Sequence, residues 1–102
     1  MDLSNNNLSE LPDEFACLTK LKRLFLSFNQ FNHIPKILAK CPALIMVAFK
    51  GNHITEFADH CLPKTIEWLI LTDNKIAKLP ATFGQYTALK KLALAGNQLS
   101  EL

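Results

Sequence analysis

Three residue types that often do chemistry stand side by side near the middle of this 102-residue chain. Asp59, His60 and Cys61 bring an acid, a base and a nucleophile into consecutive positions. Consecutive side chains point in different directions, so adjacency alone does not build a catalytic triad. We therefore predict that this tripeptide takes no part in catalysis.

Patterns for metal binding and for general acid–base chemistry are missing from the sequence as well. His33 and His53 fall at different positions of the repeat described below, and no C-x-x-C or H-x-x-x-H string of the kind used by zinc sites occurs. The acidic residues are scattered, and no spacing pairs two of them. The sequence predicts no enzyme activity, no catalytic residue, no cofactor and no metal site.

The charge of the chain is nearly balanced, with 11 lysines and arginines against 9 acidic residues and a formal net charge of +2. No run of five or six basic residues occurs, which argues against a nucleic-acid partner. Lys90 and Lys91 form the only adjacent lysine pair, and Lys20, Lys22 and Arg23 cluster far from them in the sequence. We predict that both groups are solvated edges rather than a phosphate-binding site.

The longest apolar run, Ala43 to Phe49, is far shorter than a membrane span. The start of the chain has neither the basic region nor the apolar region of a secretory signal. Cys17, Cys41 and Cys61 are an odd number of cysteines spread through the chain, which favours reduced thiols over a disulfide framework. We therefore expect a cytoplasmic protein that binds no membrane.

Five asparagines recur at intervals of 22 or 23 residues and organise the whole chain. They are Asn6, Asn29, Asn52, Asn74 and Asn97. The apolar–x–apolar triplet that ends three positions before each asparagine predicts a short strand with one buried face, so successive repeats would form a parallel sheet. Because an amide both donates and accepts hydrogen bonds, we expect the asparagines to form a ladder that satisfies backbone groups inside the solenoid.

The segments that return from one strand to the next predict a second kind of element. After Pro12, Pro35 and Pro80, apolar residues follow three or four positions apart, which favours a short helix or 3-10 turn on the convex side. The third return lacks this early proline, is one residue shorter and carries Pro63 late, so we expect a more extended convex side there. Cys41 occupies a leucine position of the second return and is predicted to serve packing.

The pattern L-x-x-L-x-L-x-x-N-x-L, written five times, resembles the typical leucine-rich repeat of about 23 residues. The resemblance covers the whole chain and implies an α/β solenoid: a leucine-rich-repeat horseshoe arc with a short parallel β-sheet on the concave side and short helical or 3-10 turns on the convex side. We expect residues 1–102 to form a single domain of about five repeats, a piece of a longer array that lacks both polar caps.

A narrower resemblance concerns residues 46–52, 68–74 and 92–97 and the shortened return before Trp68. These stretches are similar to the repeat region of bacterial proteins in which the array precedes a protein-kinase-like domain, which implies that the chain is the recognition arm of such a protein. No H-R-D or D-F-G string and no glycine-rich loop occurs within the 102 residues.

Strand residues that do not enter the core should form columns that cross the concave face from repeat to repeat, because neighbouring strands lie about 4.8 Å apart. The first column is Arg23, Met46, Trp68 and Lys91; the second is Phe25, Ala48, Ile70 and Ala93; the third is Ser27, Lys50, Thr72 and Ala95; and a fourth, at the strand end, is Phe28, Gly51, Asp73 and Gly96.

The middle of these columns is the predicted partner-binding site. Four large apolar side chains surround the small Ala48 and should form a notch, and charged residues rim them, an arrangement typical of protein-binding hot spots. The apolar residues are Phe25, Met46, Trp68 and Ile70, and the rim residues are Arg23, Lys50, Asp73 and Lys91.

The sequence therefore favours a scaffold that binds a protein or peptide on its concave face and has no catalytic activity of its own. Self-association end to end, through uncapped terminal repeats, is a further expectation. Two alternatives stay open at this point. The array could be the regulatory or targeting arm of a larger enzyme such as a bacterial protein-kinase-like protein, or it could be a purely structural segment.

Overall fold

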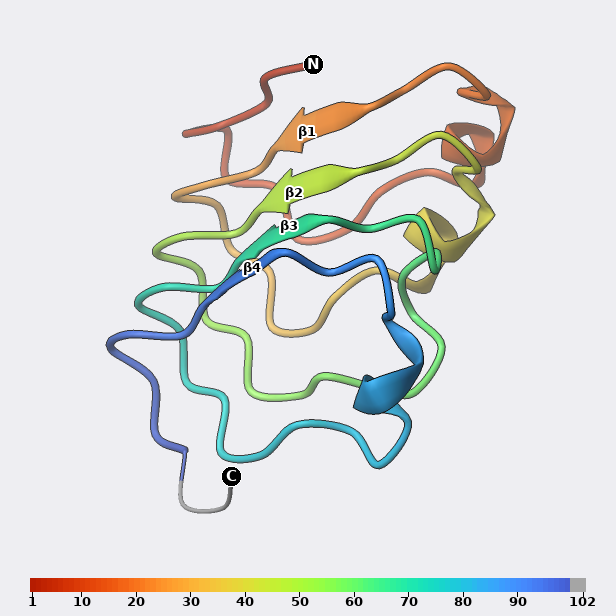
Figure 1. The fold of residues 1–102 in the computed structure, drawn as a ribbon. Coiled ribbons are helices and arrows are strands. Elements are labelled where there is room, and N and C mark those ends of the chain that lie inside the picture. Colours follow the sequence, from red (N-terminus) through yellow and green to blue (C-terminus); the bar gives the residue numbers. More distant parts are fainter. Residues whose placement is uncertain (100–102) are drawn as a thin grey trace.

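Four short strands, one from each of four successive coils, form a parallel sheet along one side of the molecule (Figure 1). A computed structural model describes residues 1–99 of the chain. The strands are β1 (Arg23–Phe25), β2 (Met46–Ala48), β3 (Trp68–Ile70) and β4 (Lys91–Ala93), and they lie in the order β1-β2-β3-β4. The sheet order follows the chain order, which confirms the predicted solenoid.

Each strand begins one residue before the apolar–x–apolar triplet that predicts it. In β2, Val47 is the fully buried central residue, while Met46 before it faces outward and is half-buried. The same alternation places Leu24 and Leu69 in the core. Side chains of a strand alternate between its two faces, so the residues on either side of these positions belong to the outer, concave face of the sheet.

The first residues of the chain continue the sheet beyond β1 (Figure 1). The Phe25 N–H donates to the Met1 carbonyl at 3.0 Å, and the Leu3 N–H donates to the Phe25 carbonyl at 2.8 Å. Asp2 is thereby placed opposite Phe25 in a parallel bridge. The edge of β1 is therefore covered by the chain itself, and the second column extends by one residue to Asp2.

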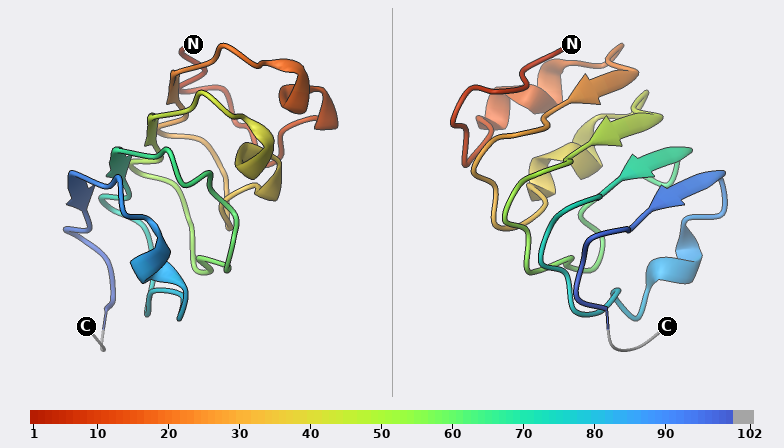
Figure 2. Two further views of the ribbon diagram at one scale, coloured as in Figure 1. Left: turned by 45° about the vertical axis from the view of Figure 1, so that its right-hand side comes forward. Right: turned by 90° about the vertical axis from the view of Figure 1, so that its left-hand side faces the viewer.

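Short 3-10 helices occupy the segment that leads from the N-terminal residues to β1 and two of the three returns that connect the strands, on the side of each coil away from the sheet (Figure 2). They are η1 (Asp13–Cys17), η2 (Lys36–Lys40) and η3 (Phe83–Gln85). Pro12 and Pro35 stand directly before η1 and η2 in extended backbone, where their fixed φ angle suits a helix start. The third return, between β2 and β3, has no helix within the described residues, as its late Pro63 predicts.

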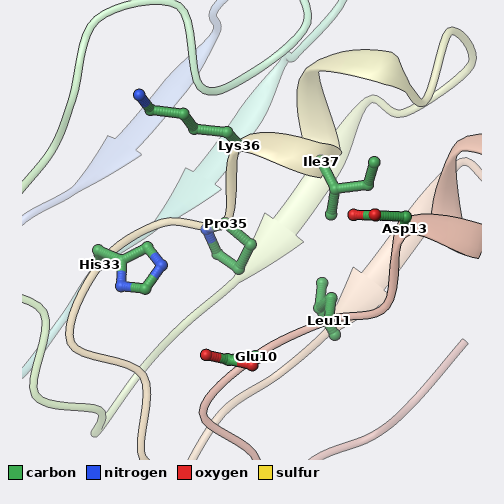
Figure 3. Close-up of a pocket in the computed structure, with 7 residues that line it drawn as sticks. All are labelled: Glu10, Leu11, Asp13, His33, Pro35, Lys36 and Ile37. Carbon is green, nitrogen blue, oxygen red and sulfur yellow. The ribbon is translucent and has the colours of Figure 1, made fainter.

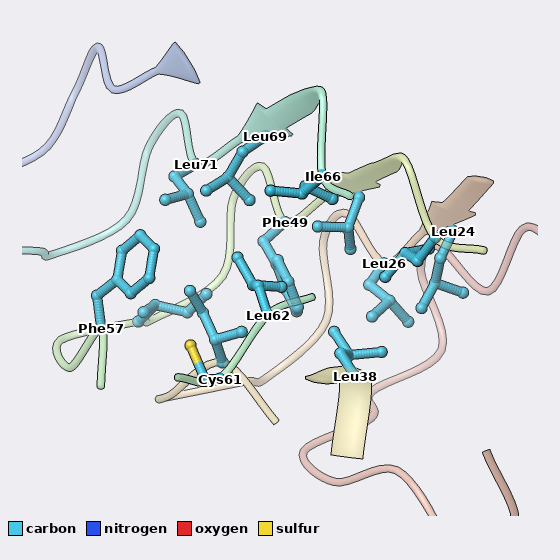
Figure 4. Packing of buried hydrophobic residues seen from close by; sticks show 14 of the residues in the cluster. Leu24, Leu26, Leu38, Phe49, Phe57, Cys61, Leu62, Ile66, Leu69 and Leu71 are labelled. Carbon is cyan, nitrogen blue, oxygen red and sulfur yellow. The ribbon is translucent and has the colours of Figure 1, made fainter. Parts of the chain in front are cut away.

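The core lies between the sheet and the returns (Figure 4). Leu24 and Leu69 from the strands point into the same interior as Leu38 from η2 and Cys61 from the third return. Cys41 is also fully buried, as its leucine position predicts. Burial of these apolar side chains is the main force that holds successive coils together.

Asparagine side chains connect one coil to the next inside this core. The Asn52 Oδ1 accepts a hydrogen bond from the Phe31 N–H at 3.1 Å, and its Nδ2 donates to the carbonyls of Leu26 and Phe49 at 3.0 and 2.9 Å. Equivalent bonds, each joining two coils, are made by Asn29, Asn74 and Asn97. These bonds confirm the predicted ladder for four of the five asparagines, whereas the exposed Asn6 side chain donates only to carbonyls of its own coil.

Candidate functional site

The strand register brings the predicted columns together on the concave face. Arg23 lies opposite Met46, Met46 opposite Trp68 and Trp68 opposite Lys91, so the first column is continuous across four strands. The second column is continuous in the same way, as Phe25, Ala48, Ile70 and Ala93. Figure 2 shows the four strands that carry both columns lying side by side.

The centre of this face is an apolar band. Phe25, Met46, Trp68 and Ile70 are all half-buried, whereas Ala48 between them is only 6% exposed. A small side chain among larger neighbours would form the low floor of the predicted notch. Four cavities of the structure are lined by other residues, so the notch predicted at Ala48 stays a prediction.

The charged rim of the band is accessible to a partner. Arg23, Lys50, Lys91 and Asp73 are all exposed, and none of them forms an ion pair with another residue among residues 1–99. The one ion pair in that part of the chain joins the Lys90 Nζ to the Glu67 Oε1 at 3.1 Å, immediately before β4 and β3. Three unpaired cations therefore border the apolar band.

The fold also brings together two basic clusters that lie far apart in the sequence. They are Lys20, Lys22 and Arg23, and Lys90 and Lys91. Each cluster ends on the first residue of a strand, and backbone hydrogen bonds place the residues just before the strands in line across the coils. The Ile45 N–H donates to the Lys22 carbonyl at 2.9 Å, the Glu67 N–H to the Ile45 carbonyl at 2.7 Å, and the Lys90 N–H to the Glu67 carbonyl at 2.7 Å. The two clusters thus lie along one edge of the sheet.

The strand end carries a row of residues with left-handed backbone, and one of them is an exposed phenylalanine. Phe28, Gly51, Asp73 and Gly96 have φ angles of 57°, 71°, 59° and 77°. Phe28 is 51% exposed, and a positive φ is unusual for such a bulky side chain. A Cβ atom at Gly51 would lie 2.6 Å from the Phe28 ring, so the glycine makes room for that ring. The repeat spacing predicts that Phe28 lies at the strand end, but a phenylalanine does not predict a left-handed backbone.

The reactive tripeptide does not form a catalytic constellation. The Asp59 Oδ1 accepts a hydrogen bond from the Thr82 hydroxyl at 2.6 Å, and this bond, together with a second one from the Thr82 N–H, lowers the pKa of that carboxyl group. Asp59 and His60 are exposed, whereas the Cys61 side chain is fully buried and desolvation raises its pKa to about 12. A thiol in that state is a poor nucleophile at neutral pH.

The cavities in the structure are lined by residues outside the four strands. A cavity of about 260 Å³ between the first two returns is lined by Glu10, Asp13, His33 and Lys36, among others (Figure 3). Within residues 1–99, no group of three histidine, cysteine or acidic side chains is placed to hold a metal ion. None of the helices in that range has the length and hydropathy needed to cross a membrane.

A second cavity, of about 240 Å³, lies beside the shortened third return and is lined by residues of three coils, including Ala39, Pro63 and Tyr86. The Tyr86 hydroxyl is buried and has no hydrogen-bond partner among the described residues, and burial raises its pKa. Its ring packs with Phe57 and Phe83, so its role in the fold is apolar packing of the convex side.

Comparison with known proteins identifies the repeat. The Leucine Rich Repeat family model matches residues 1–18 and 20–41. A solved leucine-rich-repeat protein from Leptospira interrogans has a TM-score of 0.84 and 26% identity over 98% of this chain and 26% of that one. The chain is a leucine-rich-repeat protein. Its sheet and 3-10 turns form the arc that this fold implies.

Two further similarities are to larger proteins, a plant receptor and a probable protein kinase. The plant peptide hormone receptor RGFR1, solved in complex with RGF2, matches with a TM-score of 0.78 and 29% identity over 89% of this chain and 15% of the receptor chain. The probable serine/threonine-protein kinase pats1 of Dictyostelium discoideum is 34% identical over 103 residues, which is 95% of this chain but 3% of that protein. The leucine-rich-repeat chain thus spans a small part of each of these proteins.

Proposed function

We propose that this leucine-rich-repeat chain is a scaffold module that binds a protein or peptide through its concave face and catalyses no reaction itself. The observation that carries the proposal is the register of the four strands, which gathers side chains from three repeats into one apolar band. Phe25, Met46, Trp68 and Ile70 form this band, and a partner that covers them would bury aromatic and sulfur-containing surface, which interfaces favour.

Known proteins support a peptide or protein as the partner. The similar plant receptor is a peptide hormone receptor and was solved in complex with RGF2. Repeat scaffolds generally present such surfaces, and the residues on the strands decide which ligand fits. For this chain, the proposed contacts are the apolar band together with its rim of Arg23, Lys50, Asp73 and Lys91.

The experiment is capture from an extract of the source cells, followed by titration of the purified partner. Trp68 is the only tryptophan of the chain, so its emission reports this face directly. We expect the partner to shift Trp68 emission to shorter wavelength and to bind Trp68→Ala and Phe25→Ala more weakly by about 2 kcal/mol, roughly thirtyfold. Lys91→Ala should weaken binding much less.

The matched control is Lys40→Ala, which changes an exposed residue at the end of η2 on the convex side. A captured protein that binds Trp68→Ala and Phe25→Ala as tightly as the parent, or that is lost only with Lys40→Ala, would refute concave-face binding. If no partner is retained at all, the third possibility, a purely structural array segment, becomes the better description.

A second candidate function follows from the similarity to a probable protein kinase. The chain spans 3% of that relative, so the array could serve as the regulatory or targeting arm of a larger enzyme. Kinase motifs in the reading frame that follows the array would support this proposal, and their absence from the whole gene would exclude it. Concave-face binding is compatible with either outcome.

We further propose that the chain works in a reducing compartment such as the cytoplasm, as one domain over residues 1–102. All three of its cysteines are free, and two of them are buried as thiols. End-to-end self-association stays a proposal as well. Light scattering at high concentration distinguishes a monomer from an oligomer.

A further inference from the structure

Basic residues dominate one edge of the sheet. The four residues before each strand, together with the first residue of the strand, contribute six exposed cations and a single acidic residue. The cations are Lys20, Lys22, Arg23, Lys64, Lys90 and Lys91, and the acidic residue is Glu67. Glu67 is already paired, with its Oε1 atom 3.1 Å from the Lys90 Nζ. The five other cations form no ion pair among residues 1–99.

The other acidic residues among residues 1–99 lie outside these positions. Asp13 and Glu14 belong to η1 on the convex side, Asp59 lies in the third return, and Asp2 and Asp73 lie toward other parts of the concave face. A net charge of only +2 therefore hides a local cationic edge next to the apolar band. Such an edge attracts acidic partners and repels basic ones.

The first column fixes the distance between two of these cations. Arg23 and Lys91 stand at its two ends, on β1 and β4, and Met46 and Trp68 lie between them. Three steps of about 4.8 Å between neighbouring strands separate the backbones of the two end residues by about 14 Å. An extended peptide covers that distance in about four residues, and its residues i, i+2 and i+4 face the same side.

We propose that the concave face binds an extended partner segment with the pattern acidic–x–apolar–x–acidic, lying across the strands along the first column. The two acidic side chains meet Arg23 and Lys91. The apolar side chain between them lies between Met46 and Trp68, beside Ala48 of the second column. This inference rests on the proposed function, and it adds the chemistry and the register of the partner.

Electrostatics in this arrangement act on register more than on total affinity. Arg23 and Lys91 are exposed, so each ion pair with a partner is screened by water and salt. The apolar side chain supplies most of the contact area, whereas the two cations decide where along the first column it comes to rest. Binding should therefore weaken as the salt concentration rises, without disappearing.

The test uses two synthetic peptides of identical composition. The first, acetyl-Ser-Glu-Thr-Leu-Thr-Glu-Ser-amide, places both glutamates on the same side as the leucine. The isomer acetyl-Ser-Thr-Glu-Leu-Glu-Thr-Ser-amide has the same charge but turns both glutamates away from it. We expect the first peptide to bind at least about fivefold more tightly, read from the blue shift of Trp68 emission, because only it can satisfy both cations.

Variants of the protein identify the two cations. Arg23→Gln and Lys91→Gln should each weaken the first peptide by about three- to fivefold at low salt and should leave the isomer nearly unchanged. Lys40→Gln removes one positive charge from the convex side and is the matched control for net charge. Lys91→Glu should bind better when one glutamate of the peptide is replaced by lysine, which also gives the direction of the peptide.

The proposal is overturned if the two isomers bind equally, if neither binds up to millimolar concentration, or if Lys40→Gln weakens the first peptide as much as Arg23→Gln does. Single-stranded polyuridylate is the probe for the other source of negative charge. Tighter binding of this probe than of the first peptide would show that the edge serves nucleic acid and would likewise overturn it. A captured partner that depends on Trp68 while the isomers bind equally would leave the proposed function standing and remove only this inference.

Discussion

Replacing one buried asparagine of the ladder tests how the coils are held together. In Asn52→Leu, a side chain that is 4% exposed loses its hydrogen bonds to the Phe31 N–H and to the carbonyls of Leu26 and Phe49, together with a longer one of 3.5 Å to the Lys50 carbonyl. The carbonyls of Leu26 and Phe49 each keep a second donor, from Asn29 and Asn74 respectively. The N–H of Phe31, a buried residue of the preceding coil, is left without this partner.

The magnitude follows from these three groups. An orphaned buried N–H costs about 1–3 kcal/mol, and each carbonyl that loses one of two bonds costs about 0.5 kcal/mol. Burial of the leucine side chain returns about 1 kcal/mol. The net expectation is a free energy of unfolding lowered by about 2 kcal/mol, which corresponds to a melting temperature lower by about 8–16 °C for a domain of this size.

Asn6→Leu is the matched control, since it makes the same change at the same repeat position. Asn6 is exposed, and its Nδ2 donates to the carbonyls of Leu3 and Ser4, where water can replace it. Its effect should stay below about 0.5 kcal/mol. Urea unfolding followed by circular dichroism measures both variants. Equal effects of the two substitutions, or an Asn52→Leu protein that melts within a degree of the parent, would refute the ladder reasoning.

Three other perturbations follow from the same structure. Phe28→Asn should raise the free energy of unfolding by up to about 1 kcal/mol, because asparagine tolerates a left-handed backbone better than phenylalanine does; a urea midpoint below that of the parent would contradict this. Iodoacetamide at pH 8 should modify Cys17 alone, since Cys41 and Cys61 are buried and desolvation raises the pKa of each, that of Cys61 to about 12, so intact mass should show one adduct. Trp68→Ala should cost about 1 kcal/mol or less, because Trp68 is on the outer face of β3; a variant that fails to fold would instead place that residue in the core.

Much of the fold is predictable because two periods in the sequence agree. The interval between asparagines sets the length of a coil, and the alternation of apolar residues beside Leu24, Val47 and Leu69 sets which strand face is buried. A shift of one residue would turn every core side chain outward, so register is strongly constrained once one face is apolar. The columns of the concave face follow from these periods without any further information.

The sequence is less informative where the structure depends on local backbone conformation or on neighbours in space. The left-handed backbone at Phe28 is imposed by the turn that ends each strand, and glycine occupies the equivalent Gly51 and Gly96. A phenylalanine at such a position gives no signal of its own, because its residue type is common in strands. The ring position becomes predictable only after Gly51 is known to lie beside it.

The basic edge is a second case in which spatial neighbours decide. Lys22 and Lys90 are far apart in the sequence, and each belongs to a short cluster that resembles an ordinary solvated edge. In a solenoid, residues at the same repeat position become neighbours, and hydrogen bonds through Ile45 and Glu67 place these two in one line. Counting charge by repeat position rather than along the chain would have found the edge.

Repeat position also explains why the fold and the proposed binding surface are specified separately in this protein. Residues such as Leu24 and Val47 are fully buried and maintain the coil, whereas their outward neighbours Arg23 and Met46 contribute little to it. Substitutions at the outward positions can therefore change which partner fits without changing the arc. The buried positions therefore determine the solenoid, whereas the chemistry of the proposed partner depends on the first and second columns.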